Sequence, residues 1–446
     1  MRVSDNQSRV CDLLLSARWV IPVEPHGVVL EDHAVAIVDG CIVDLLPTRD
    51  APASWRTRER VHLAEHALLP GLVNAHTHNP MTLMRGLADD LPLMTWLHDH
   101  IWPAEAKVIG PEFVRDGIDL AIAEMLRGGT TCCNENYFFP DTAGNTYAKA
   151  GFRAMVGLPI IDFPTAWAAS ADEYFAKAQS TYEKFCDASL IGTCFAPHAP
   201  YTVSDENFLR IGEHSKALDL RIHCHVHETA QEVSDSLRDH GVRPLVRLDR
   251  LGLLDSRMIA VHMTQLNDAE IARCAEAGAH VVHCPESNLK LASGFCPMAK
   301  LMAAGVNVAI GTDGCASNND LDMIGEMRTA ALLAKAVAGD AAAGDAASVL
   351  RAATLGGAHA IGWGERIGSI EVGKRADLAA IRLDDLETQP VYHPLSQIVY
   401  AGNRRQFTDV WIDGRARLRE GALIDVDVAR LRAIAREWQA RIASEA

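Results

Sequence analysis

The sequence predicts an α/β protein: a (β/α)8 TIM-type barrel with a small β-sandwich domain formed by the N- and C-terminal segments. From Leu68 onward, short apolar runs alternate with helix-like segments, which is the pattern of βα units and a parallel sheet. On both sides of this region, strand-like runs are separated by Asp-Gly turns. The 446 residues can hold a barrel of about 250 residues, insertions and a second domain.

The N-terminal part of the small β domain is predicted over residues 1–66. Asp12 to Val20 is an apolar run, and Ala34 to Val38 and Ile42 to Leu46 flank the dipeptide Asp39-Gly40. Asp-Gly between two apolar runs is a strong hairpin signal. We therefore expect short antiparallel strands here.

The strand pattern returns after about Ile367. An apolar run covers Leu378 to Ile381, and a second Asp-Gly hairpin signal occurs at Asp413-Gly414. We therefore expect residues 368–425 to complete the small β domain. Helical spacing over residues 426–446 predicts a closing helix.

Residues 67–367 contain eight candidate barrel strands, and helix-like segments lie between most of them. Pro111 to Arg127, for example, begins with Pro and is followed by Gly128-Gly129. Eight regularly spaced units favour a closed barrel over a doubly wound open sheet, which is the alternative. The runs are Leu68–His76, Thr130–Tyr137, Phe152–Leu158, Ile191–Pro197, Leu220–His227, Met258–Gln265, His280–Cys284 and Val306–Asp313.

Composition and charge narrow the classes of partner. The net charge of −16 argues against nucleic acid and anionic membranes, but not against a small neutral or zwitterionic substrate. The eleven cysteines have no repeated spacing, and Met1 to Gln7 lacks the pattern of a secretory leader. No uncharged apolar segment is long enough to span a bilayer. We expect a cytoplasmic protein, and a homo-oligomer is compatible with these features.

The first candidate strand ends in His76-Thr77-His78. Alternate residues of a strand point to the same side, so both imidazoles can project together from the strand end. Two adjacent imidazoles suit a borderline-soft metal ion such as zinc. The remaining ligands are then expected at the ends of other strands.

Histidine and carboxylate recur at the ends of four further candidate strands. In a barrel, catalytic groups sit at these carboxyl ends. On the fifth run, three histidines share one parity, so alternation cannot choose among them, although position at the strand end favours His225. The residues are His198, then His223, His225, His227 and Glu228, then His262, and finally Asp313 between two glycines.

Packing is the simpler interpretation of several other histidines. His280 and His283 are expected to be buried core residues, and His33, His62 and His66 to lie at the surface or between domains. Asp313 could instead be a helix N-cap or a turn residue.

At these residues the chain resembles the amidohydrolase superfamily, in its mononuclear deaminase branch. PGLVNAHTHNPMTLMRGLADDLPLMTWL, CHVHET, CPESNLKLASG and GTDGCASNNDLDM resemble the 5′-methylthioadenosine/S-adenosylhomocysteine deaminases, and triazine chlorohydrolases share much of this pattern. The resemblance implies one Zn²⁺ per subunit, with Fe²⁺ or Mn²⁺ as alternatives, held by His76, His78, His225 and Asp313. Residues 191–197 lack the lysine that bridges a second metal in dinuclear relatives.

The resemblance also implies catalytic roles. Glu228 is placed to protonate a ring nitrogen, and burial should raise its pKa. His262 is expected to orient the attacking oxygen. Asp313, with a second oxygen free, is expected to carry the water proton to the leaving amine.

Substrate contacts are expected from two further residues. Glu105 matches the carboxylate that binds the ribose diol in relatives that act on nucleosides, and His198 matches a substrate-contacting histidine. Read without the family, Glu105 is a solvated helix residue and His198 a loop-stabilising one. Leu93, Met94, Trp96 and Trp102 are candidates for an apolar wall, or for simple packing.

The expected activity is zinc-dependent hydrolytic deamination of the adenine ring of 5′-methylthioadenosine, S-adenosylhomocysteine or adenosine, a small nucleoside substrate. The alternatives are a deaminase or chlorohydrolase of another heteroaromatic ring, such as guanine, 8-oxoguanine or an s-triazine, and a non-catalytic scaffold. Every expected ligand position is filled, which disfavours the scaffold.

Overall fold

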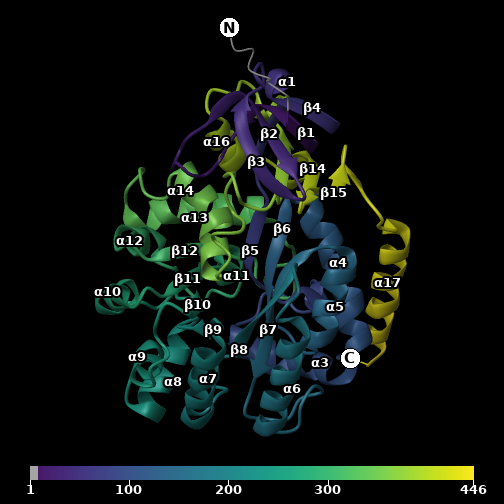
Figure 1. Ribbon diagram of the computed structural model, residues 1–446. Helices are drawn as coiled ribbons and strands as arrows, with labels where there is room; N and C mark the ends of the chain where they lie inside the picture. Colours follow the sequence, from purple (N-terminus) through teal and green to yellow (C-terminus); the bar gives the residue numbers. More distant parts are fainter. Residues whose placement is uncertain (1–8, 446) are drawn as a thin grey trace.

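The computed structural model describes residues 9–445, which form a barrel and a terminal sheet (Figure 1). The stretch Met1 to Gln7, which enters the sequence-based expectation of a cytoplasmic protein, lies outside the described residues. The predicted barrel is confirmed, because the strands from β5 to β12 are neighbours in chain order in one parallel sheet. They are β5 (Leu72–Thr77), β6 (Thr130–Glu135), β7 (Arg153–Ile160), β8 (Ile191–Pro197), β9 (Ile222–Val226), β10 (Met258–His262), β11 (His280–His283) and β12 (Asn307–Ile310).

Helices follow or precede these strands and cover the outside of the barrel. The strands β5, β6 and β7 are buried along their whole length, which explains their continuous apolar runs. The helices are α4 (Pro111–Arg127), α5 (Pro140–Ala150), α6 (Ala171–Phe185), α7 (Asp205–Leu218), α8 (Ala230–His240), α9 (Pro244–Arg250), α10 (Asp268–Ala277), α11 (Pro285–Lys290), α12 (Met298–Ala303), α13 (Met323–Ala338), α14 (Ala346–Arg351) and α15 (Gly357–Ala360).

Local sequence signals explain where these helices begin and end. The helix α4 has the predicted bounds, with Pro111 in its first turn and Gly128 after its end. The helix α10 begins at a capping box in which Asn267 and Glu270 satisfy each other's backbone N–H groups, and it ends at Gly278.

The loop after β5 forms a cover of short helices over the carboxyl end of the barrel. It places several apolar side chains and one carboxylate near the histidine-bearing strand end. Its elements are η1 (Asn79–Met84), α2 (Leu93–Thr95), η2 (Trp96–Ile101) and α3 (Trp102–Val108).

Both chain ends contribute to the second sheet, as predicted. Its strands are hydrogen-bonded as one continuous sheet in the order β16-β15-β14-β13-β4-β1-β2-β3. Apolar side chains from both ends of the chain, such as Leu15, Ile37, Leu378 and Trp411, form its inner core. The strands are β1 (Arg9–Val20), β2 (Leu30–Val38), β3 (Cys41–Pro47), β4 (Trp55–Pro70), β13 (Leu378–Arg382), β14 (Phe407–Ile412), β15 (Arg415–Arg419) and β16 (Ala422–Leu423).

Both predicted Asp-Gly hairpins occur in this sheet. Asp39 and Gly40 connect β2 to β3 with φ of 49° and 73°, and Asp413 and Gly414 connect β14 to β15 with φ of 51° and 70°. Positive φ at both central residues matches the twist of the flanking strands.

The first predicted barrel strand, Leu68–His76, is in fact parts of two strands. The strand β4 continues to Pro70 and pairs with β13, whereas β5 begins at Leu72 in the barrel. The change occurs at Gly71, where a Cβ atom would lie 2.0 Å from Oγ1 of Thr131. The apolar run could not reveal this change, because both strands are buried here.

The remaining elements are short helices and the C-terminal helix. The short elements α1 (Ala51–Ser54), η4 (Leu386–Thr388), α16 (Pro394–Ser396), η5 (Gln397–Ala401) and η6 (Arg404–Gln406) belong to the terminal segments, and η3 (Ala352–Gly356) connects α14 to α15. The helix α17 (Val428–Glu445) lies along α4 (Figure 1), where Trp438 Nε1 donates to Asp116 Oδ2 at 3.0 Å. Among the described residues, no helix combines the length and apolarity that crossing a membrane requires.

Candidate active site

The site lies at the seam where the barrel closes. The backbone N–H of Asp313, just after β12, donates to the carbonyl of His76 on β5 at 3.0 Å. Two residues before His76 and one before Asp313, the Asn74 side-chain amide and Thr312 exchange two hydrogen bonds, of 2.7 and 2.9 Å. Barrel closure therefore brings together residues that are 237 positions apart in the chain.

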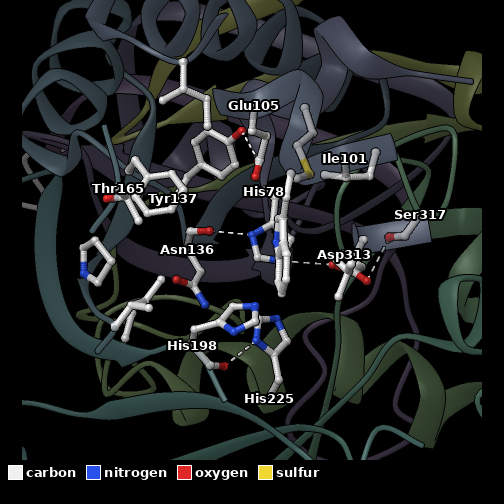
Figure 2. A pocket seen from close by; sticks show the side chains of 18 of the residues that line it. His78, Ile101, Glu105, Asn136, Tyr137, Thr165, His198, His225, Asp313 and Ser317 are labelled. Carbon is white, nitrogen blue, oxygen red and sulfur yellow. Dashed lines mark hydrogen bonds and ion pairs between the residues drawn. The ribbon is translucent and has the colours of Figure 1, made fainter. Parts of the chain in front are cut away.

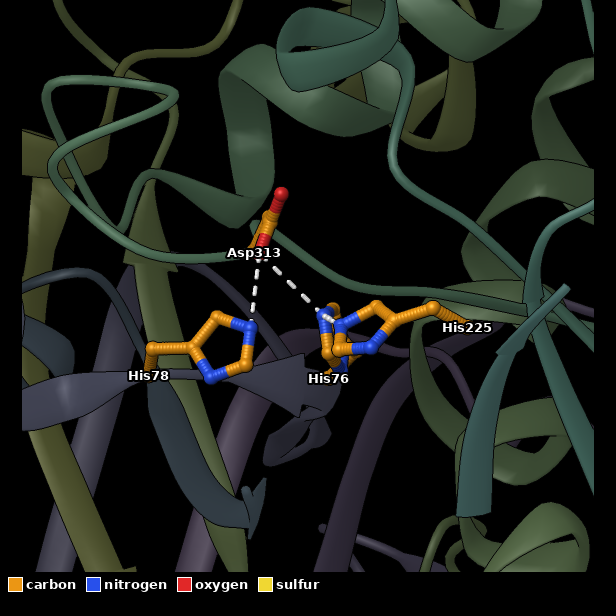
Figure 3. A group of neighbouring side chains, drawn as sticks. All are labelled: His76, His78, His225 and Asp313. Carbon is orange, nitrogen blue, oxygen red and sulfur yellow. Dashed lines mark hydrogen bonds and ion pairs between the residues drawn. The ribbon is translucent and has the colours of Figure 1, made fainter. Parts of the chain in front are cut away.

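Three histidines and one aspartate meet at this seam (Figure 3). Nε2 of His76 and Nε2 of His78 lie 3.1 and 3.2 Å from Oδ1 of Asp313. Nε2 of His225 lies 3.2 Å from Nε2 of His76. One ligand atom of each residue lies within 4.8 Å of the ligand atoms of the other three.

The other ring nitrogen of each histidine already has a partner. Nδ1 of His78 donates to the carbonyl of Asn136 at 2.5 Å, and Nδ1 of His225 donates to the carbonyl of His198 at 2.6 Å (Figure 2). Since a carbonyl only accepts, both Nε2 lone pairs are left for another bond. Nδ1 of His76 lies 3.0 Å from Nε2 of His223. Orienting contacts of this kind are usual for histidines that bind metal ions.

This group of donors fits a single zinc ion. Imidazole nitrogen and carboxylate oxygen are zinc ligands, and nitrogen lone pairs facing each other in a buried site repel unless a cation lies between them. The strand β8 carries no lysine at the site, so the group has no bridging ligand for a second ion.

The carboxylate of Asp313 is held on both oxygens, contrary to the prediction of a free second oxygen. Oδ1 accepts from the backbone N–H of Gly314 at 2.8 Å, and Oδ2 accepts from the hydroxyls of Ser287 at 2.7 Å and Ser317 at 2.9 Å. Asp313 also has a φ of 62°, so its side-chain direction depends on a left-handed backbone. Nothing at Asp313 itself signalled the two serines: Ser287 lies on helix α11, and Ser317 lies in the segment after β12.

Glu228 and His262 face each other beside the metal-binding group. Nε2 of His262 lies 3.8 Å from Oε1 of Glu228, and Nδ1 of His262 is 2.9 Å from Oδ1 of Asn288. Burial raises the pKa of Glu228 above its ordinary value, and Asp313 adds to this, although His262 and His78 act against it. A carboxyl group that keeps its proton more readily is suited to donate one.

A cavity of about 300 Å³ opens beside these residues. His78, His225 and Asp313 line it, together with Glu105 and His198 (Figure 2). Glu228 and His262 line it as well. Such a cavity is large enough for a small organic molecule.

Glu105 is buried in this cavity, and the solvated-helix interpretation is therefore wrong. Its Oε1 accepts a 2.5 Å hydrogen bond from the Tyr137 hydroxyl. Burial raises the pKa of Glu105 to about 7, against the lowering effects of Tyr137 and His78. His198 lies across the cavity with Nδ1 3.1 Å from the Thr202 hydroxyl, and burial lowers its pKa to about 4.

The expected apolar wall is present in part. Leu93, Trp96 and Trp102 line the cavity, whereas Met94 is not among its lining residues. Met94 is instead 37% exposed, because it lies on the outer side of the short helix α2.

On β9 the structure distinguishes the three histidines of equal parity. His225 joins the metal-binding group, His223 lies behind His76, and His227 accepts from the backbone N–H of Leu245 at 3.0 Å. His227 follows the end of β9 and has a φ of 55°, so its side chain leaves the alternation of the strand. Of the two histidines on the strand, His225 is nearer the strand end, and it is the one that reaches the metal-binding group.

Several residues of the site were missed by sequence reasoning. Asn136 and Tyr137 directly follow β6, so the strand-end rule applied to histidine could have indicated them. Ser287 and Asn288 lie in the motif CPESNLKLASG, which was noted above without a role for any residue. Their hydrogen bonds to Asp313 and His262 explain why this stretch belongs to the site.

Comparisons with known proteins agree with this geometry. Residues 67–417 match the amidohydrolase family. A 5-methylthioadenosine/S-adenosylhomocysteine deaminase from Teredinibacter turnerae is 46% identical over 97% of this chain and 98% of its own.

Solved structures are similar as well. An adenosine deaminase from Xanthomonas campestris with bound zinc is 64% identical, with a TM-score of 0.97 over 98% of this chain and 100% of its own. An atrazine chlorohydrolase from Arthrobacter aurescens shares the fold, with a TM-score of 0.89 at 22% identity over 96% of this chain and 99% of its own.

Proposed function

This chain belongs to the amidohydrolase family, and on this basis we propose that it is a zinc-dependent deaminase of adenine nucleosides. It replaces the ring amino group of 5′-methylthioadenosine, S-adenosylhomocysteine or adenosine with oxygen from water, which yields the inosine analogue and ammonia. The observation that carries this proposal is that the metal-binding group, Glu228 and the buried carboxylate of Glu105 line one cavity. The names of the relatives support the same reaction.

His76, His78, His225 and Asp313 would hold the zinc ion. When bound, zinc supplies the Lewis acidity that makes water a nucleophile at neutral pH. Glu228 donates a proton to the ring nitrogen as the ring loses its aromaticity; burial raises the pKa of its carboxyl group, which favours the protonated form.

Neighbouring side chains orient the attacking oxygen and carry out the remaining proton transfer. His262 Nε2 faces Glu228 and orients the attacking oxygen, since Asn288 holds its other nitrogen. Asp313 passes the proton of the water to the leaving amino group. The hydroxyls of Ser287 and Ser317 keep its carboxylate in one orientation while it does so.

Glu105 and His198 bind the substrate. A carboxylate can accept hydrogen bonds from both hydroxyls of a ribose, and Glu105 lies at the cavity wall with one oxygen bonded to Tyr137. His198, neutral because its pKa is low, contacts the substrate from the opposite side.

The partner is a small nucleoside, and the proposal includes neither a nucleic acid nor a membrane. The net charge of −16 supports this choice. All eleven cysteines are free, which supports a reducing compartment and hence the cytoplasm.

The activity is tested by ultraviolet assay of the purified protein with adenosine, 5′-methylthioadenosine, S-adenosylhomocysteine, guanine and a triazine, with ammonia release as a second readout. We expect deamination of the adenine nucleosides, its loss on chelation and its return with added zinc. Turnover of only guanine or the triazine favours another heteroaromatic substrate. No bound divalent ion, and no ammonia after zinc is added, favours a non-catalytic scaffold.

The ribose contact is tested with Glu105→Gln. Losing a charged hydrogen-bond acceptor should raise the KM for adenosine about 10- to 100-fold, with little change for the free base guanine if the protein turns it over. Where no base is a substrate, competitive inhibition by adenine gives the same comparison. Equal effects on nucleoside and base would contradict this role for Glu105.

A further inference from the structure

The substrate cavity is charged and polar near the metal-binding group and apolar beyond Glu105. On the same segment as Glu105, the side chains of Ile101, Trp102 and Ile109 line the cavity. Phe163, from the loop after β7, faces them, with its ring centroid 6.2 Å from that of Trp102. A nucleoside whose ring lies at the metal-binding group and whose ribose lies at Glu105 directs its 5′ substituent toward this apolar wall.

We propose that this wall selects nucleosides with an uncharged, apolar 5′ substituent, so that 5′-methylthioadenosine is deaminated in preference to S-adenosylhomocysteine. The inference rests on the proposed function and narrows its substrate class. The two nucleosides share the adenine ring, the ribose and the thioether. They differ because the second carries an ammonium and a carboxylate at the end of its 5′ chain.

The charges of the cavity argue against binding that second end. Among the described residues that line the cavity there is no lysine or arginine, and its acidic side chains are Glu105, Glu228 and Asp313. The apolar wall offers neither charge a partner: the carboxylate would lose water without gaining a cation, and the ammonium would lose water against apolar side chains. A methylthio group loses no such hydration and gains contact with Trp102 and Phe163.

The neutral donors near the wall do not replace a cation. The Tyr137 hydroxyl is used by Glu105, and the Thr165 hydroxyl lies 2.6 Å from that of Tyr174. Trp96 Nε1 and Asn136 Nδ2 have no partner among the described residues, but both donors are uncharged. Neutral hydrogen bonds of this kind do not balance the desolvation of a carboxylate.

The test compares kcat/KM of the zinc-loaded enzyme for 5′-methylthioadenosine, S-adenosylhomocysteine and adenosine. We expect 5′-methylthioadenosine to exceed S-adenosylhomocysteine by about tenfold or more, a difference of at least about 1.4 kcal/mol. Equal or higher values for S-adenosylhomocysteine would overturn the inference. Failure of all three nucleosides would instead contradict the proposed function itself.

A substitution at Phe163 tests whether this wall is the part of the cavity that discriminates between the two nucleosides. Phe163 is 41% exposed, so Phe163→Arg can place a cation opposite Trp102 without emptying the core, and Phe163→Met is the matched uncharged control. We expect Phe163→Arg to raise the ratio of kcat/KM for S-adenosylhomocysteine over 5′-methylthioadenosine at least about threefold relative to Phe163→Met. Equal ratios in the two variants would overturn the assignment of this wall to the 5′ substituent.

Discussion

At the scale of single residues, Glu228 illustrates how burial prepares a side chain for proton transfer. Its carboxyl group lies beside His262 and has a raised pKa because it is buried. We expect Glu228→Gln to lower kcat about 10²- to 10⁴-fold, the usual contribution of one general acid. The zinc content, measured by atomic absorption, should stay unchanged, because Glu228 is outside the metal-binding group.

The matched control for this variant is Glu206→Gln on the exposed side of α7, which should leave kcat unchanged. A Glu228→Gln enzyme that keeps full activity would exclude Glu228 as the proton donor. Loss of zinc together with loss of activity would point to a structural role.

We assign the pH dependence of substrate binding to the ionisation of Glu105. Burial raises its pKa to about 7, while Tyr137 and His78 lower it. The ionised form accepts both ribose hydroxyls, so the KM for adenosine should fall as the pH rises through about 7. Steady-state kinetics of the wild-type enzyme at pH values below and above about 7 measures this change in KM. In Glu105→Gln the KM should no longer change there, and a flat profile in the wild type would contradict the assignment.

At the scale of elements, the crossing from β4 to β5 depends on a position without a side chain. A Cβ atom at Gly71 would lie 2.0 Å from Oγ1 and 2.2 Å from Cγ2 of Thr131. We expect Gly71→Ala to reduce the free energy of unfolding by about 1–3 kcal/mol, the usual cost of overpacking. Chemical denaturation measures this change.

Gly110→Ala is the control, because a Cβ atom there meets nothing within 4 Å and the backbone is extended. It should have a much smaller effect on unfolding. Similar losses in the two variants would mean that the close approach to Thr131 is not the cause.

At the scale of the whole molecule, Arg153 connects the barrel to the terminal sheet. It is 1% exposed, and its guanidinium lies 2.6 Å from Asp377 and 2.5 Å from Asp413. We expect Arg153→Met to reduce the free energy of unfolding by about 3–5 kcal/mol, because the buried carboxylate of Asp377 loses its counter-charge, whereas Asp413 keeps Arg375. Urea denaturation followed by circular dichroism checks this.

Arg238 on α8 serves as its counterpart, because it also pairs with two aspartates but is largely exposed. Arg238→Met should leave unfolding nearly unchanged, since water and salt screen such pairs. If Arg153→Met proved equally mild, the connection between the barrel and the sheet would not depend on this ion pair.

Much of the fold and part of the site follow from local sequence patterns. The alternating runs predicted the parallel barrel, and the two Asp-Gly dipeptides predicted hairpins that the structure contains. These signals are local, because strand burial and turn conformation depend on neighbouring residues. The change of sheet at Gly71 escaped prediction, because one apolar run serves both strands.

What the sequence by itself determined is the chemistry available at the strand ends: His76 and His78 on one side of a strand, and a carboxylate after the last strand. The sequence favoured His225 over His223 and His227 only by its position at the strand end, and the tertiary structure shows that it is the one that meets them. The tertiary structure alone decided that Ser287 and Ser317 hold Asp313. The physical reason is that side-chain direction along a strand is a local property. The distance between two strand ends depends on how the whole barrel closes.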